Sequence, residues 1–133
     1  MKEILTKQLL EVYQEVSHRR GNGNFTLDQC SALFRPVLKE LSQCIPSEEK
    51  WAYCLTVDQQ SNQTLHVCTT CDELMVEGFV IHEPHQVRHF CSETCLYEAG
   101  ITMEMYNQNY DEEGQPYDPP KNPEWESYYY EWY

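Results

Sequence analysis

The segment Cys68-Thr-Thr-Cys71 is followed, nineteen residues later, by Cys91-Ser-Glu-Thr-Cys95. Two cysteine pairs with C-x2-C and C-x3-C spacing are typical of a four-thiolate zinc site, in which each pair supplies one side of a tetrahedron. Four protein ligands leave no open position for a substrate or a water. The pattern therefore predicts one structural Zn²⁺, held by Cys68, Cys71, Cys91 and Cys95.

Three alternatives compete with this interpretation. A redox-active C-x2-C pair would leave Cys91 and Cys95 without a role. A second possibility is that His66 or His89 replaces one cysteine as a ligand. A third is a separate metal held by His82-Glu-Pro-His85, although a polar turn accounts for this segment more simply.

The sequence lacks the patterns of common enzyme sites. A zinc deaminase places His-x-Glu before Pro-Cys-x-x-Cys, and neither that order nor the proline is present. We also find no phosphate-binding glycine loop, nucleophile elbow or carboxylate pair in a clear context. We therefore predict that the protein is not an enzyme.

The first part of the chain predicts a helical hairpin. Apolar side chains recur every three or four positions in residues 2–18, and the turn Gly21-Asn-Gly-Asn24 ends this run. A second run begins with a capping-box pattern at Thr26, and Pro36 predicts a kink or a break within it. The buried face of the first helix is expected to hold Ile4, Leu5, Leu9, Val12, Tyr13 and Val16. Two cysteines of the second helix, Cys30 and Cys44, are expected to be small buried residues.

The segments around the four cysteines predict strands and short helices. Residues 51–57 alternate as a strand does, and residues 64–67 predict a return strand that leads into Cys68. Residues 78–90 predict a hairpin that delivers Cys91. Ser92 is a good N-cap for a short helix that carries the last cysteine.

These elements predict an α+β fold in three parts. Residues 1–50 form the helical segment, and residues 51–106 form a treble-clef-like zinc module of two β-hairpins and short helices. Residues 107–133 form an acidic, Tyr- and Trp-rich tail.

The negative charge is concentrated in the second half of the chain. The net charge is −13, yet residues 1–57 hold seven basic and seven acidic side chains. Residues 58–133 hold fifteen acidic side chains against Arg88 and Lys121. Such a surface repels nucleic acid and membrane phosphates and attracts basic proteins. We therefore expect a basic protein partner, no direct DNA or RNA binding and no membrane binding.

Several features favour a cytoplasmic location. No run of eighteen apolar residues occurs, and the N-terminal residues lack the apolar core of a secretory signal. The seven cysteines are an odd number, which a closed disulfide framework does not use. In the cytoplasm they would be thiols or metal ligands.

The C-terminal segment combines charge with aromatic side chains. Residues 104–133 hold eight acidic residues, four prolines and nine of the chain's seventeen aromatics. An acidic, proline-rich composition is typical of disorder, but so many aromatics indicate either packing on the zinc module or a binding epitope. Both alternatives stay open here. The candidate partner-binding residues are Asp111, Glu112, Glu113, Asp118, Glu124, Trp125, Glu126, Tyr128, Tyr129, Tyr130 and Trp132.

The cysteine motifs also resemble a known family. Cys68-Thr-Thr-Cys71-Asp-Glu-Leu-Met75, Glu77-Gly-Phe79, Phe90-Cys-Ser92 and Thr94-Cys-Leu96 are similar to small four-cysteine zinc fingers of phages and mobile elements of Gram-positive bacteria. That family is related to the Phe-Cys-Ser type of treble clef, and its members often end in an acidic Tyr/Trp segment. The resemblance covers roughly residues 66–133 and implies a fold and a setting more than a reaction.

Two functions fit these observations. The first is an inhibitor, similar in size and acidity to anti-CRISPR proteins, that occupies the basic nucleic-acid channel of an RNA-guided nuclease. The second is a zinc-stabilised adaptor that docks through its Tyr/Trp tail without competing with nucleic acid. A nucleic-acid-binding finger is a weaker third, because it would reach phosphates with little but Arg88.

Overall fold

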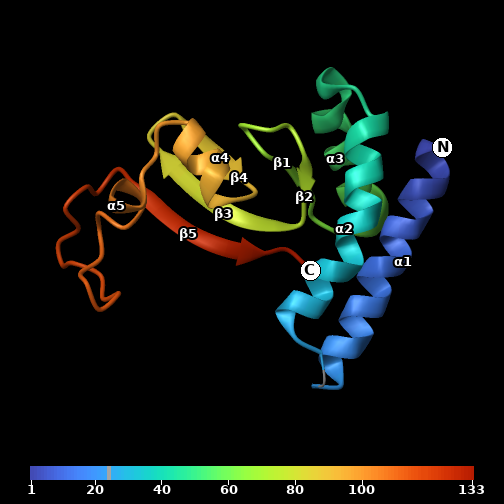
Figure 1. Cartoon of the computed structure of the whole chain (residues 1–133), viewed down its shortest axis with the longest axis horizontal. Coiled ribbons are helices and arrows are strands. Elements are labelled where there is room, and N and C mark those ends of the chain that lie inside the picture. Colours follow the sequence, from blue (N-terminus) through green and yellow to red (C-terminus); the bar gives the residue numbers. More distant parts are fainter. Residues whose placement is uncertain (24) are drawn as a thin grey trace. The chain divides into compact units, whose positions relative to one another are not determined.

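The chain forms two units, and each is assembled from segments that are separated in the sequence (Figure 1). The computed structural model describes residues 1–23 and 25–133. The helical unit comprises Met1–Val67, Asp72–Val76 and Trp132–Tyr133, and the cysteine unit comprises Cys68–Cys71 and Glu77–Glu131. No helix in the described part of the chain is long and apolar enough to cross a membrane.

Helix α1 (Lys2–Gly21) confirms the first predicted helix. It buries Leu5, Leu9, Tyr13 and Val16, which recur every three or four residues along one face. Ile4 was expected on that face, but it is 60% exposed because it lies beside the buried stripe rather than in it. Of the predicted turn after this helix, Asn24 lies outside the described residues.

Helix α2 (Leu27–Cys44) begins with the predicted capping box. The Thr26 hydroxyl accepts from the Gln29 N–H, and the Gln29 side chain accepts from the Thr26 N–H. Of the predicted kink or break near residues 32–35, the break is wrong, because the helix continues through Pro36. Buried side chains lie on both sides of the proline, and their packing in one core holds the two halves in one helix. They are Cys30, Phe34, Val37, Leu38 and Leu41.

The two cysteines of α2 have different environments. Cys30 is buried in the helical core, as predicted. Cys44 is exposed, so the prediction of burial is wrong for it. It occupies the last position of the helix and lies off the buried stripe, which continues from Leu41 to Ile45.

Residues 51–57 are not a strand, because they lie within helix α3 (Ser47–Ser61). Their alternation predicted that Trp51 and Leu55 share a face with Tyr53 and Val57, yet Trp51 is 73% exposed. The buried positions are instead Lys50, Tyr53 and Val57, whose spacing of three and four residues is helical. The N-terminal half is therefore built from three helices rather than a hairpin of two.

A short antiparallel ladder completes the helical unit. Strand β1 (His66–Val67) confirms the predicted strand before Cys68 in a shorter form. Its partner is β2 (Leu74–Met75) rather than residues 51–57, which are helical, so the predicted hairpin with residues 51–57 is wrong. The buried Ser42 hydroxyl accepts from the Leu74 N–H at 2.8 Å. This bond ties β2 to helix α2.

The last two residues of the chain belong to the same core. The Trp132 N–H donates to the Val76 carbonyl at 2.8 Å, and the Trp132 ring meets His66 edge-on at 4.4 Å. The Tyr133 ring packs against Phe34, with centroids 5.0 Å apart. Trp132, one of the predicted partner-binding residues, is thus half-buried within the helical unit.

The cysteine unit is built on a three-stranded antiparallel sheet in the order β4-β3-β5. Strands β3 (Glu77–Glu83) and β4 (Gln86–Phe90) form the predicted hairpin. Strand β5 (Glu126–Glu131) lies on the other side of β3, and tyrosine-rich sequences suit such a position. No strand was predicted in this C-terminal segment. Short helices α4 (Glu93–Glu98) and α5 (Met103–Tyr106) follow β4 in the sequence.

A buried ammonium group stabilises the helical unit. Lys50 is only 5% exposed, and its Nζ lies 3.0 Å from a carboxylate oxygen of Asp72, which also accepts from Ser47. These bonds from Ser47 and Lys50 lower the pKa of Asp72.

We expect Asp72→Asn to lower the free energy of unfolding by about 1–3 kcal/mol, because it leaves the buried ammonium without its counter-charge. Lys50→Met should cost less, since it removes the charge together with its desolvation penalty. Urea titration followed by circular dichroism measures both. An equal or greater loss in Lys50→Met would show that the ion pair itself is not the stabilising element.

Candidate metal centre

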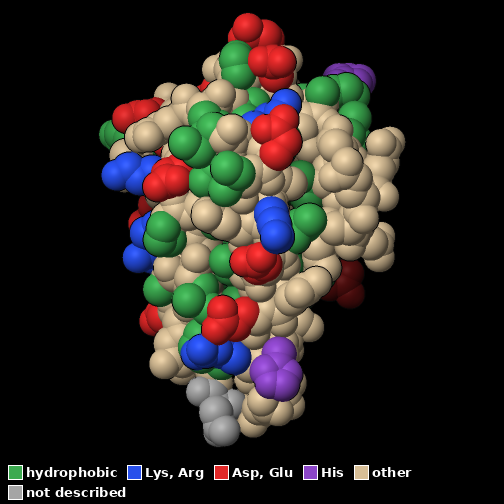
Figure 2. Space-filling view, turned by 90° about the vertical axis from the view of Figure 1, so that its right-hand side faces the viewer, with side chains coloured by type: hydrophobic (Ala, Val, Ile, Leu, Met, Phe, Trp, Pro, Cys, Tyr) green, Lys and Arg blue, Asp and Glu red, His purple; other side chains and the backbone are tan. Residues whose placement is uncertain are grey.

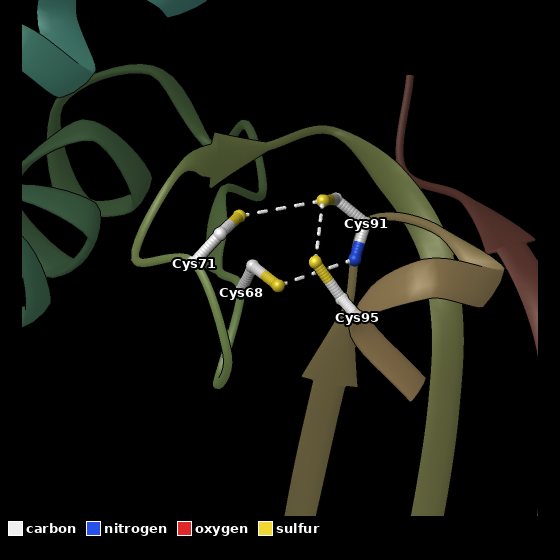
Figure 3. A group of neighbouring side chains, drawn as sticks. All are labelled: Cys68, Cys71, Cys91 and Cys95. Carbon is white, nitrogen blue, oxygen red and sulfur yellow. Dashed lines mark hydrogen bonds between the residues drawn. The ribbon is translucent and has the colours of Figure 1, made fainter. Parts of the chain in front are cut away.

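Four sulfur atoms converge within the cysteine unit (Figure 3). The Sγ atoms of Cys68, Cys71, Cys91 and Cys95 all lie within 4.8 Å of one another. Cys91 Sγ is 3.5 Å from Cys71 Sγ and 3.6 Å from Cys95 Sγ. In a tetrahedral site with metal–sulfur bonds of about 2.3 Å, neighbouring sulfur atoms lie about 3.8 Å apart. The two sulfur atoms of a disulfide are only about 2.05 Å apart. The four cysteines can therefore bind a metal ion, and their spacing is that of ligands rather than of disulfides.

The first pair lies on a tight turn, the knuckle Cys68–Cys71, between β1 and β2 in the sequence. The chain leaves this turn through Asp72, whose φ of 66° is left-handed. Aspartate is one of the few residues other than glycine that adopt this conformation readily. The sequence therefore allows the sharp reversal that places both thiols on one side of the site.

The second pair is placed by the start of helix α4. Cys91 directly follows β4, and Ser92 is the N-cap, as predicted: its hydroxyl accepts from the Cys95 N–H at 3.2 Å. Glu93 lies in the first turn, where the helix dipole favours a negative charge. Cys91 and Cys95 are thereby brought onto one side of the helix start.

Hydrogen bonds hold the knuckle against β4 and α4. The Thr69 N–H donates to the His89 carbonyl, and the Thr70 hydroxyl donates to the Cys95 carbonyl, each at 2.8 Å. The Cys91 N–H points to Cys68 Sγ at 3.4 Å. The two threonines between the first cysteines therefore have a structural role, which the C-x2-C spacing alone does not indicate.

The same contacts shift the pKa values of two of these thiols in opposite directions. A hydrogen bond from the Cys91 thiol, followed by backbone N–H groups of residues 70, 71 and 91, lowers the pKa of Cys68 to about 4. The pKa of Cys91 is raised, because its thiol donates to Cys68 and because burial disfavours a second thiolate. Without a cation, the site stabilises one thiolate and disfavours the ionisation of a second thiol. A bound metal reverses this preference by replacing the thiol protons.

No histidine belongs to this group among the described residues, which contain no other metal-binding group of three or more His, Cys, Asp or Glu. His66 packs against Trp132 in the helical unit, and burial lowers its pKa. The His82 ring shares a 2.8 Å hydrogen bond with the Tyr128 hydroxyl. The four-cysteine donor set is therefore the one that the geometry supports.

The predicted partner-binding residues come from a loop, a strand and the end of the chain, and three of them, Asp111, Glu112 and Tyr128, line one hollow. Asp111, Glu112, Glu113, Asp118, Glu124 and Trp125 lie in the loop between α5 and β5, and Glu126, Tyr128, Tyr129 and Tyr130 lie in β5. Tyr129 and Tyr130 are 45% and 51% exposed, whereas Tyr128 is half-buried against His82. Trp132 lies in the other unit.

Comparison with known proteins returned no match to any family model, curated protein or solved structure. The resemblance to phage zinc fingers stays a prediction that depends on the cysteine motifs themselves.

We expect the purified, reduced protein to carry about one metal ion per chain. Cys71→Ser should lower the bound metal well below this value and should reduce the thermal stability, because one of the four ligands is lost. Elemental analysis with a thermal melt measures both. Cys44→Ser is the matched control, since that exposed cysteine lies outside the group. Full metal content in Cys71→Ser would contradict the assignment.

Proposed function

We propose that the bound metal is Zn²⁺ and that its role is structural. Four thiolates form a soft donor set that suits zinc, and four protein ligands leave no position for a substrate. A knuckle, a hairpin and a helix that follow one another around such a site are typical of a treble clef, so we interpret the cysteine unit as a module of this kind. In this proposal the protein is not an enzyme, and the metal orders a surface that acts on a partner.

We further propose that this surface binds a basic protein and blocks its binding of nucleic acid. The observation that supports this proposal is the uneven distribution of charge between the two units. The cysteine unit holds twelve acidic side chains against Arg88 and Lys121, a net charge of −10. Four thiolates around Zn²⁺ would make the unit about two charges more negative.

The helical unit lacks this excess. It holds ten acidic and seven basic side chains, a net charge of −3. The face over α1 and α3 shows Lys and Arg interspersed with Asp and Glu (Figure 2). The negative field therefore originates mainly from the cysteine unit, so a basic partner would be attracted there.

Both cations of the cysteine unit already have internal partners. The Arg88 guanidinium makes two bonds to the Glu83 carboxylate, at 2.8 and 2.9 Å. The Lys121 ammonium lies 4.4 Å from the centre of the Tyr117 ring. With only two cations among twelve carboxylates, the unit offers few contacts to phosphates, so direct nucleic-acid binding is disfavoured.

RNA-guided nucleases are suitable targets for such a protein. They hold their nucleic acids in positively charged grooves, which a rigid acidic module can occupy. The resemblance to phage-encoded zinc fingers agrees with an inhibitor that acts in the cytoplasm of a bacterial host. The second candidate is an adaptor that docks through tyrosines, and the exposed Tyr129 and Tyr130 favour it.

We expect the protein to compete with labelled DNA for a guide-loaded nuclease from a Gram-positive bacterium, and to lose affinity as salt rises. Glu112→Gln combined with Glu113→Gln should weaken the inhibition about tenfold. Glu11→Gln with Glu40→Gln removes the same charge from the helical unit and should have little effect. Fluorescence anisotropy at several salt concentrations measures this.

An affinity for the partner that changes neither with salt nor with added DNA would refute the inhibitor function and favour the adaptor function. A gel shift that shows tight binding of DNA or RNA by the protein alone, at physiological salt, would overturn the argument from charge. Changing Cys68 and Cys91 to Ser should unfold the cysteine unit and abolish partner binding together, if the metal is structural.

A further inference from the structure

A hollow of about 1010 Å³ lies within the cysteine unit, bordered by α5, the loop that follows it and the start of β5. Phenol rings and carboxylates make up about half of its lining, which also includes neutral side chains such as Asn107 and Gln108. The phenol rings are those of Tyr106, Tyr110, Tyr117 and Tyr128, and the carboxylates are those of Glu104, Asp111 and Glu112. Lys121 is the one basic side chain among the described residues that line it.

The loop that borders this hollow is held by its own hydrogen bonds. The Asn109 amide donates to the carbonyls of Asn122 and Trp125, at 3.0 and 2.7 Å, and its oxygen accepts from the Asn122 N–H at 2.8 Å. The Asp111 carboxylate accepts from two backbone N–H groups, of Glu113 and Gln115. The bonds between Asn109 and Asn122, thirteen positions apart, therefore join the two ends of the loop. They give the hollow defined walls.

Two of the four tyrosines of the hollow, Tyr106 and Tyr128, are held by neighbouring side chains. The Tyr106 ring meets Phe79 edge-on at 5.4 Å, and burial is the main cause that raises its pKa to about 12. The Tyr128 hydroxyl is held by His82. These side chains are neutral phenols at physiological pH, with the electron-rich ring faces that attract cations.

One ring of the hollow already holds a cation. The ammonium of Lys121 lies 4.4 Å from the centre of the Tyr117 ring, within the range of a cation–π contact. This lysine comes from the same loop and is itself exposed to solvent. It occupies the position that a cationic side chain of another protein would take.

We propose that this hollow receives an arginine or lysine side chain of a basic protein partner, and that Lys121 occupies the Tyr117 ring until that side chain displaces it. The inference rests on the proposed function for the identity of the partner as basic. Carboxylates and phenol rings together favour a cation and disfavour phosphates. The volume exceeds that of one side chain and also accommodates the neighbouring backbone of a peptide.

The probe is the peptide acetyl-Gly-Arg-Gly-Arg-Gly-amide, titrated into the full-length, metal-loaded protein and followed by NMR. The control peptide carries citrulline, a neutral isostere, in place of both arginines. We expect the arginine peptide to bind about tenfold more tightly and to shift the Tyr106 and Tyr117 ring resonances. Equal binding of both peptides would overturn the proposal.

Two pairs of variants separate the hollow from general electrostatics. Tyr117→Leu should weaken peptide binding severalfold, whereas Tyr97→Leu, on the exposed surface of α4, should not. Lys121→Gln should strengthen binding severalfold, because it removes the internal competitor. Arg88→Gln changes the net charge equally but lies outside the hollow, so it should have a smaller effect. Equal effects within either pair would refute the assigned site.

The outcomes also distinguish this inference from the proposed function. If the peptide fails to bind while the protein still competes with DNA for a nuclease, the proposed role of the hollow is refuted and the inhibitor function is retained. If the peptide binds as expected but no competition with nucleic acid occurs, the hollow stands and the inhibitor is wrong.

Discussion

The convergence of four thiols from two distant chain segments is the constraint on which the cysteine unit depends. The sulfur atoms lie within 4.8 Å of one another, a separation at which several thiolates repel strongly unless a cation lies between them. The chain prepares this arrangement with the left-handed Asp72, the N-cap Ser92 and hydrogen bonds from both threonines of the knuckle. A metal ion bound by the four sulfur atoms would stabilise what these local elements have already brought together.

The two units differ in charge and in the size of their apolar cores. The helical unit holds an extended apolar core with nearly balanced charge, and even its buried Lys50 has a counter-charge. The cysteine unit has a small core and a large excess of carboxylates. Its two cations contact side chains of the same unit, and ten carboxylates remain in excess.

The aromatic C-terminal segment contributes to both units. Trp132 and Tyr133 pack in the helical unit, while the tyrosines of β5 extend the sheet of the cysteine unit. Packing and exposure therefore coexist within a few residues. Tyr128 is held by His82, whereas Tyr129 and Tyr130 remain about half exposed. The loop before β5 adds a hollow in which tyrosines and carboxylates surround a lysine of the same chain.

The sequence by itself determined the features whose causes are local. The spacing within each cysteine pair, the capping box at Thr26, the hairpin that ends at Phe90 and the N-cap Ser92 each depend on residues a few positions apart. Tertiary structure decided the rest. Residues 51–57 alternate like a strand, and only the core that buries Lys50, Tyr53 and Val57 selects the helix. Strand β5 depends on a partner, β3, more than forty residues earlier, and the hollow depends on a loop closed by Asn109. Such contacts between distant residues leave no local pattern, because hydrogen-bonding and apolar groups are common to many segments and the fold alone selects which of them meet.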